Sequence, residues 1–103
     1  MPKSKRSKAC DISKKVKAEV KERDHSRCIW CGKFIAFPQL CHYISRGSGG
    51  LGVPENLVCG CADCHREADQ GLHTQRYKQA MREHLKRCYP DWDESKLRYR
   101  KDG

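Results

Sequence analysis

The sequence predicts a small α+β domain in which a bound metal ion supplements a small hydrophobic core. Two Cys-x-x-Cys motifs, Cys28 to Cys31 and Cys61 to Cys64, lie in the middle of a chain of 103 residues. Short apolar segments, interrupted by Pro and Gly, lie between these motifs and are typical of strands. Helical patterns precede and follow them. Strands in the centre with helices at both ends indicate the α+β class.

The composition favours a metal-stabilised protein. Only 37% of the residues are hydrophobic and 34% are charged, so one domain of this length has a marginal core. The N-terminus is basic and lacks the apolar run of a signal peptide. We therefore expect a cytoplasmic protein whose eight cysteines stay reduced. The longest apolar run, Phe34 to Phe37, is too short to span a membrane.

The net charge points to a polyanionic partner. The formal charge is +9; four thiolates would contribute −4 and the zinc ion they bind +2, so about +7 remains. Nucleic acid is the expected partner, because backbone phosphates supply most non-specific affinity for basic proteins. The plainer alternative is a protein with a solvated basic surface.

Residues 1–12 are predicted to form a basic, flexible arm, and residues 13–103 a single domain. The arm either lies along a DNA backbone or only keeps the protein in solution. A helix is expected over residues 13–23 because Ser13 can cap it.

The predicted first helix carries a narrow apolar stripe. Ile12, Val16 and Val20 repeat every four residues, so they share one helix face. We expect this stripe to pack against the first cysteine motif.

The two cysteine motifs have the spacing of a four-thiolate zinc site. Each Cys-x-x-Cys turn can place its two sulfurs about 2.3 Å from one tetrahedral ion, and two turns complete the shell. Trp30 is expected to cover the thiolates, with stacking on a nucleic-acid base as the alternative. Gly32 is expected to adopt a positive φ angle at the end of the first turn.

Between the motifs, residues 33–45 are predicted to form a β-hairpin or a loop running into a strand. A glycine-rich loop over residues 45–52 follows, and it lacks the Gly-Lys-Ser/Thr ending of a Walker loop. Residues 54–58 lead into a second strand, and residues 62–69 form a helix that ends at Gly71.

A longer helix is predicted over residues 74–88, followed by a tail. Thr74 is expected to cap the helix, and Pro90 to end it. The tail is expected to fold Trp92 and Leu97 back onto the helix. One helix face carries the apolar residues Tyr77, Met81, Leu85 and Cys88.

The central residues resemble the HNH endonuclease family. In order, the chain has His42, Arg46, Gly49-Gly50, Asn56-Leu57 and Cys61-Ala-Asp-Cys64-His65. The local sequence around His42 and Gly50 is similar to that of small phage and prophage HNH proteins with a four-cysteine structural zinc. The resemblance covers at least residues 23–69.

The resemblance implies a ββα-metal (His-Me finger) core within residues 23–69. It makes His42 the general base, which suits an imidazole whose pKa is near neutrality. It makes His65 a ligand of a catalytic divalent metal. Asn56 is then expected to hydrogen-bond across the loop and orient His42, and Arg46 to clamp a phosphate.

Two further residues bear on the catalytic metal. Asp69 lies four residues after His65, so both side chains share a helix face and can chelate one ion. Pairing of Asp69 with a nearby arginine is the alternative. Cys41 stands where much of the family has an acidic residue or His. Either Cys41 binds a transition metal, or Asp69 and water replace it, or the catalytic site is weakened.

The other cysteines and histidines receive structural interpretations. Cys59 is expected to be a small buried residue, although it can in principle replace a zinc ligand. Cys10 and Cys88 are expected to be structural or free. The three remaining histidines, which we expect on the surface, are His25, His73 and His84.

The expected function is that of a metal-dependent HNH endonuclease that nicks DNA with low sequence specificity. It uses Mg²⁺, Mn²⁺, Ni²⁺ or Zn²⁺ beside the structural zinc, and works as a monomer or weak homodimer. If the gene belongs to a phage or prophage, the resemblance implies the bacterial host cytoplasm and packaging proteins as partners. The alternatives are a non-catalytic, zinc-ribbon-like nucleic-acid-binding module and a zinc-containing protein–protein adaptor.

Overall fold

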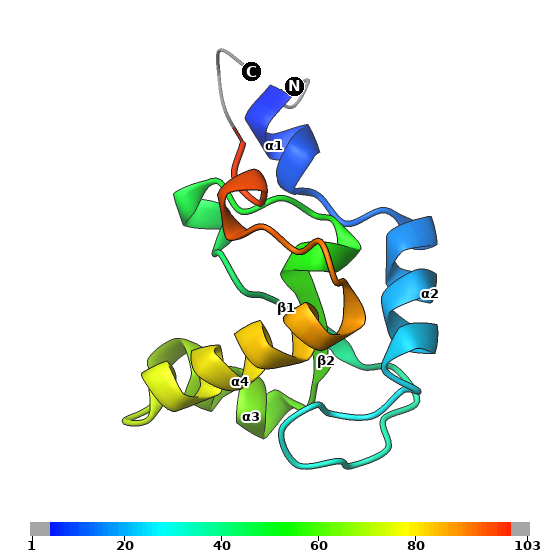
Figure 1. Ribbon diagram of the computed structural model, residues 1–103. Coiled ribbons are helices and arrows are strands. Elements are labelled where there is room, and N and C mark those ends of the chain that lie inside the picture. The colour runs from blue at the N-terminus through cyan, green and yellow to red at the C-terminus, as the bar shows by residue number, and fades with distance from the viewer. Residues whose placement is uncertain (1–4, 100–103) are drawn as a thin grey trace.

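The computed structural model describes residues 5–99 and confirms the α+β class (Figure 1). A two-stranded antiparallel sheet lies between helices. Three short 3-10 turns cover Arg46–Ser48, Pro54–Asn56 and Glu94–Lys96. Within residues 5–99, no helix has the length and apolar character that a membrane span requires. The helices and strands are α1 (Lys5–Cys10), α2 (Lys14–Arg23), β1 (Gln39–His42), β2 (Leu57–Gly60), α3 (Ala62–Gln70) and α4 (Thr74–Cys88).

The strand register divides the sheet residues between two cores. Cys41 pairs with Val58, and the neighbouring pair is Leu40 with Cys59. Because successive side chains point to opposite faces of a strand, these two pairs lie on opposite faces of the sheet. The first pair packs against α4 and the second against α2.

The core on the α4 side contains Cys41, Val58, Met81 and Leu85, all of which are buried. The predicted apolar face of α4 is therefore confirmed for Met81 and Leu85. Around these residues pack the partly buried side chains of Ile29, Trp30, Tyr43, Tyr89 and Trp92. Helix α4 packs beside α3, which holds the second cysteine motif against the same core (Figure 1).

Helix α2 covers the opposite face of the sheet. Its N-terminus is capped as predicted, since the backbone N–H of Val16 donates to Ser13 Oγ at 3.2 Å. Val20 is fully buried against Leu57 and Cys59. The apolar stripe thus packs against the sheet, and its predicted packing against the cysteine motif is wrong. The buried position of Cys59 agrees with its interpretation as a small core residue.

The predicted flexible arm over residues 1–12 needs correction. Residues 1–4 lie outside the described part, but Lys5–Cys10 form α1. The end of α1 is docked, because Cys10 is only 2% exposed and the N–H of Gly52 donates to the carbonyl of Ala9 at 3.0 Å. A glycine is needed at position 52, since a Cβ there would overlap the carbonyl of Asp11. Sequence patterns missed this contact because it joins distant segments.

Of the two alternatives for residues 33–45, the loop running into a strand is correct. Phe34 makes only an isolated bridge to Arg27, and the strand begins at Gln39. Phe34 is 61% exposed and Phe37 is 90% exposed.

The C-terminal tail crosses the glycine-rich loop. The N–H of Leu51 donates to the carbonyl of Leu97 at 2.8 Å, and Leu97 is buried beside this loop. Its packing onto α4 stays a prediction. Trp92 does join the α4-side core as expected. Thr74 does not cap α4, because its hydroxyl donates to the carbonyl of Gly71 at 2.8 Å.

Candidate functional site

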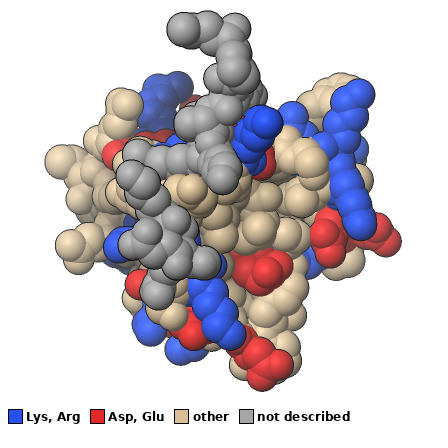
Figure 2. Space-filling model, turned by 90° about the horizontal axis from the view of Figure 1, so that it is seen from above, with Lys and Arg blue, Asp and Glu red and all other residues tan. Residues whose placement is uncertain are grey.

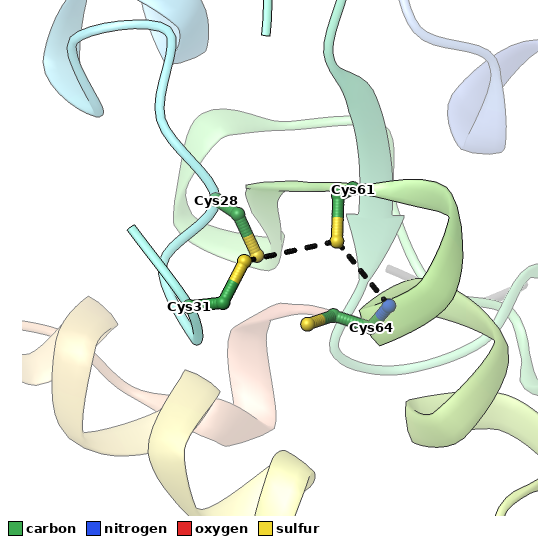
Figure 3. Close-up of side chains that lie close together, drawn as sticks. All are labelled: Cys28, Cys31, Cys61 and Cys64. Carbon is green, nitrogen blue, oxygen red and sulfur yellow. Dashed lines mark hydrogen bonds between the residues drawn. The ribbon is translucent and has the colours of Figure 1, made fainter. Parts of the chain in front are cut away.

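Four cysteine side chains from the two predicted motifs converge at one point (Figure 3). The sulfur atoms of Cys28, Cys31, Cys61 and Cys64 all lie within 4.8 Å of one another. Cys31 Sγ and Cys61 Sγ are 3.8 Å apart. Thiolates about 2.3 Å from one zinc ion stand about 3.8 Å apart in a tetrahedron. These cysteines can therefore hold a structural metal such as zinc.

The first cysteine motif forms a tight turn that favours a thiolate. The N–H of Gly32 donates to the carbonyl of Cys28 at 2.9 Å, and Gly32 has the predicted positive φ, 76°. Burial raises the pKa of the Cys28 thiol, but hydrogen bonds from the backbone N–H groups of Cys31, Cys61 and Trp30 outweigh it. The pKa of Cys28 consequently falls to about 7.

The second motif joins the end of β2 to the start of α3. Cys61 caps α3, because its sulfur accepts a hydrogen bond from the N–H of Cys64 at 3.4 Å. Burial and the neighbouring sulfurs of Cys61 and Cys28 raise the pKa of the Cys64 thiol. Several thiols can lose their protons together only when a nearby cation neutralises them. A dication held by the four sulfurs would supply this neutralising charge.

Trp30 connects the first motif to α4. Its Nε1–H donates to the carbonyl of Tyr77 at 3.0 Å, and the two rings are 5.4 Å apart. The ring packs so closely over Gly60 that a Cβ at position 60 would approach it to 2.6 Å. This packing accounts for Trp30 without base stacking.

Among the described residues, a second group of metal-ligand types brings together Asp24, His84 and Cys88. Here His84 Nε2 lies 2.8 Å from Asp24 Oδ1, and its side chain is only 20% exposed. The prediction that His84 is a surface residue is therefore wrong. Both oxygens of Asp24 already accept hydrogen bonds from Arg23 at 2.8 Å. We interpret this group as a structural ion-pair network.

His42, the predicted base, lies at the end of β1 on the face opposite Cys41, as predicted from strand alternation. Its Nε2 atom is buried and has no hydrogen-bond partner among the described residues. Burial lowers the pKa of His42, and the nearby side chains of Arg46, Lys78 and His65 lower it further. A hydrogen bond to the backbone of Cys10 raises this pKa, but by less than the other effects lower it. The ring is therefore neutral at pH 7 and lies in a cationic setting.

His65 lies on α3 with a partner at each ring nitrogen. Its Nδ1 is 2.8 Å from Oε1 of Gln39, on β1. Its Nε2 is 3.1 Å from Oδ2 of Asp69, one helical turn further along α3. The predicted helical pairing of His65 with Asp69 is thus present, and Gln39 is a partner that sequence reasoning missed.

Asn56 is fully buried and holds the loop between the two strands. Its Oδ1 accepts from the N–H of Ile44 at 2.8 Å, and its Nδ2 donates to the carbonyls of Ile44 and Leu51 at 3.1 and 2.9 Å. The expected hydrogen bonds across the loop are there. They go to the backbone, however, so Asn56 fixes the chain after His42 and not the imidazole itself.

Arg46 is engaged within the protein. One guanidinium nitrogen lies 2.7 Å from Oδ1 of Asp11, and another donates to the carbonyl of Cys10 at 3.3 Å. The side chain is still 51% exposed. A phosphate would have to compete with Asp11 for this arginine, and the role of Arg46 as a phosphate clamp stays a prediction.

Cys41, the tentative ligand of the predicted catalytic metal, lies in the core between the sheet and α4. It is 2% exposed and belongs to the α4-side core. Burial, reinforced by the charge of Asp69, raises the pKa of the Cys41 thiol to about 12. A bound cation would have to offset this raised pKa, because a thiol binds metal as the thiolate. The tentative assignment of Cys41 as a ligand stays a prediction. Within residues 5–99, no group of three close donors includes it.

Lys78, on α4, is a second residue that sequence reasoning missed. Its Nζ donates to the carbonyls of His42 and Tyr43 at 3.2 and 3.1 Å. Burial lowers the pKa of Lys78, and the negative charge of Asp69 only partly offsets this effect. A groove of about 400 Å³ runs past Lys78, Asp69 and Arg98. A lysine within an amphipathic helix gives no local signal of such a position.

On the face that Figure 2 shows, the positive charge is spread out. On the face shown in Figure 2, basic side chains do not merge into one patch, and acidic side chains lie between them. The cations around His42 are a local concentration within a basic protein of formal charge +9.

Comparisons with protein-family models and with curated proteins find no match to this chain.

Proposed function

We propose that this chain is a metal-dependent endonuclease of the HNH type, which hydrolyses phosphodiester bonds in DNA. The observation that carries the proposal is the arrangement of His65 between Gln39 and Asp69, next to His42 in a cationic setting. The order of β1, β2 and α3 agrees with a ββα-metal core.

The contacts of His65 favour a cation at its Nε2. The carbonyl oxygen of Gln39 can only accept, so Nδ1 of His65 carries a proton. In a neutral ring, Nε2 then presents a lone pair toward the carboxylate of Asp69, 3.1 Å away. Two acceptors facing each other need either a proton or a metal ion between them.

His65 and Asp69 suit a divalent ion with an incomplete protein shell. Mg²⁺ and similar ions often take only one or two protein ligands and fill the remaining positions with water and phosphate. Such an ion would stabilise the charge on the attacked phosphate and on the leaving oxygen. These two residues offer one imidazole and one carboxylate, which suit Mg²⁺, Mn²⁺, Ni²⁺ or Zn²⁺.

His42 is proposed as the general base. A neutral imidazole can accept a proton from the attacking water, and its lowered pKa keeps it neutral at pH 7. Asn56 supports it by fixing the backbone that follows. Lys78 and Arg46 place positive charge where negative charge develops on the phosphate. The four cysteines are proposed to hold zinc with a structural role only.

A non-catalytic nucleic-acid-binding module is the second candidate. It is favoured by the burial of His42 Nε2, and by the contact of the His42 imidazole with the backbone of Cys10 at the end of α1. If α1 stays in place, water reaches this imidazole poorly. The protein would then keep its zinc and its basic surface without cleaving DNA.

Supercoiled plasmid tests these two functions. The zinc-loaded protein is incubated with Mg²⁺, Mn²⁺, Ni²⁺ or added Zn²⁺, and nicked circles are measured. We expect nicking that falls at least a hundredfold in His42→Ala, while His73→Ala, which changes an exposed histidine, stays as active as wild type. Nicking that survives His42→Ala overturns the assigned base. DNA binding without nicking in any metal favours the module.

A further inference from the structure

A groove of about 580 Å³ lies between α2 and the loop that enters β1. Its apolar lining includes Ile12, Phe37, Pro38 and Leu40. The aromatic ring of Phe37 is 90% exposed. Exposed aromatic rings in an apolar recess mark contact sites more often than single exposed aliphatic residues do.

The groove has a basic edge and ends near the proposed catalytic residues. Lys17 and Lys21 of α2 line it, and the ammonium group of Lys21 lies 5.9 Å from the centre of the Phe37 ring. His65 lines it as well. An aromatic platform flanked by cations is the combination that binds single-stranded nucleic acid, because bases stack on the ring and phosphates contact the cations.

We propose that this groove binds an unpaired nucleotide of the DNA strand, with its base stacked on Phe37 and its phosphates near Lys17 and Lys21. A base within a duplex has both faces covered by its neighbours and cannot lie on the ring. The preferred substrate is therefore DNA with unpaired nucleotides, such as a single strand, a flap or a bulge. The inference rests on the proposed function for the choice of DNA and for the position of the cleaved bond, near His65.

The positive charge of the groove favours a nucleic-acid strand over an uncharged apolar ligand or a second copy of this chain. The charged side chains that line the groove, Lys17 and Lys21, are both cationic. The chain as a whole has an excess of nine positive charges. A second copy of this chain would bring lysines against lysines, which is unfavourable. A polyanion with a flat apolar face satisfies both the ring and the lysines.

Binding is measured apart from cleavage, on zinc-loaded protein without added divalent metal. The probes are a fluorescein-labelled single strand, the matched duplex and the duplex with a central bulge. We expect Phe37→Ala to weaken binding to the single strand and bulge roughly tenfold or more, the usual effect of losing one base–aromatic stack. Duplex affinity should stay within about twofold. Phe37→Trp should restore the lost affinity.

Phe34→Ala is the matched control, because Phe34 is also exposed but does not line the groove. It should bind all three probes like wild type. Lys17→Gln with Lys21→Gln should lower the salt dependence of single-strand binding by about one to two in the log–log slope. Equal binding by Phe37→Ala and wild type overturns the inference. So does an equal loss on all three probes, or loss of a protein dimer with unchanged DNA binding.

The two proposals fail separately. Phe37-dependent binding to unpaired DNA, without nicking in any metal, supports the groove and overturns the nuclease. Nicking that depends on His42 but has no preference for unpaired DNA, and no dependence on Phe37, overturns the groove alone.

Discussion

Arg23 and Asp24 are adjacent in sequence and form a buried, bidentate ion pair. Nε and a terminal nitrogen of Arg23 each lie 2.8 Å from an oxygen of Asp24. Arg23 also donates to the carbonyls of Pro54 and Leu57, at 2.8 and 2.7 Å. One arginine thereby ties the end of α2 to the start of β2. This pair fixes the strand that leads into the second cysteine motif.

Asp24 should make the protein sensitive to acid. Burial raises its pKa, but hydrogen bonds from His84, Arg23 and the N–H of Cys59 outweigh burial and hold the pKa well below its usual range. A carboxyl with a lowered pKa in the folded state contributes stability above its unfolded pKa of about 3.9. That contribution is lost as pH falls through about 4 toward the folded value.

Asp24→Asn should therefore cost about 3–5 kcal/mol near pH 7, because it leaves the Arg23 charge buried without a partner. The difference from wild type should shrink as pH falls below about 4. Urea unfolding measures both effects, with excess Zn²⁺ and metal analysis at each pH, because acid releases zinc from thiolates; only pH values at which both proteins keep their zinc are compared. Glu19→Gln, at an exposed position of α2, should change stability by less than about 0.5 kcal/mol. A constant difference between Asp24→Asn and wild type at all pH values would contradict the assigned linkage.

Removing zinc should unfold the centre of the chain. The two cysteine motifs join β2, α3 and the loop that carries Trp30, and the small cores leave little other stabilisation. Structural zinc sites contribute about 10–16 kcal/mol of apparent binding free energy, which matches or exceeds the stability of a typical domain. A chelator should abolish cooperative thermal unfolding, as measured by circular dichroism.

Cys61→Ser should have the same effect as the chelator. Cys61 both caps α3 and lies 3.8 Å from the sulfur of Cys31. Metal analysis should give one zinc per chain in wild type and in Cys88→Ser, a cysteine outside the four, but much less in Cys61→Ser. One tightly bound zinc and unchanged melting in Cys61→Ser would show that another residue completes the site.

The docking of α1 should depend on the absence of a side chain at Gly52. An added Cβ would overlap the carbonyl of Asp11, so Gly52→Ala should displace Asp11 and the end of α1 from the glycine-rich loop. We expect Cys10, now 2% exposed, to react with iodoacetamide roughly tenfold faster or more, as local opening becomes easier. Mass spectrometry of the alkylated peptide measures the rate.

Gly47→Ala is the control for this substitution. A Cβ at Gly47 meets no atom of the described residues closer than Ser45 Oγ, at 4.0 Å. Cys10 should then react as slowly as in wild type. If Gly52→Ala leaves the rate unchanged, the loop accommodates the methyl group and α1 is not held by close backbone contact.

The sequence predicts those features that depend on neighbouring residues. The cysteine turns, the positive φ of Gly32, the Ser13 cap and the buried face of α4 all follow from local spacing. The helical pairing of His65 with Asp69 follows from the four-residue repeat in the same way. Each needs only one element to be identified correctly.

The missed features join segments that are far apart. His84 was expected on the surface, yet it meets Asp24 across 60 positions of the chain. Lys78 reaches the carbonyl of His42, 36 positions away. Neither residue has an unusual local pattern, so only the packing of α4 against the sheet shows its partner. The same holds for Gln39, whose contact with His65 joins β1 to α3.

Gln39 should act as a positioning residue for metal binding by His65. Because the amide oxygen of Gln39 accepts from Nδ1–H, it keeps the lone pair of Nε2 directed toward Asp69. Removing such a partner typically costs about 10–100-fold in metal affinity. Gln39→Leu should therefore weaken Mn²⁺ binding to the zinc-loaded protein by that factor, as measured by calorimetry. Nicking should need correspondingly more Mn²⁺.

Gln39→Glu should restore the affinity, because a carboxylate also accepts from Nδ1–H. Nitrogen NMR of the imidazole gives a readout that a merely structural role would not change. It should report the Nδ1–H tautomer of His65 in wild type and Gln39→Glu, and a mixture in Gln39→Leu. Equal Mn²⁺ affinity in Gln39→Leu and wild type, with the tautomer altered, would mean that His65 Nε2 is not a metal ligand. The 3.1 Å contact with Asp69 would then be an ordinary helical pair.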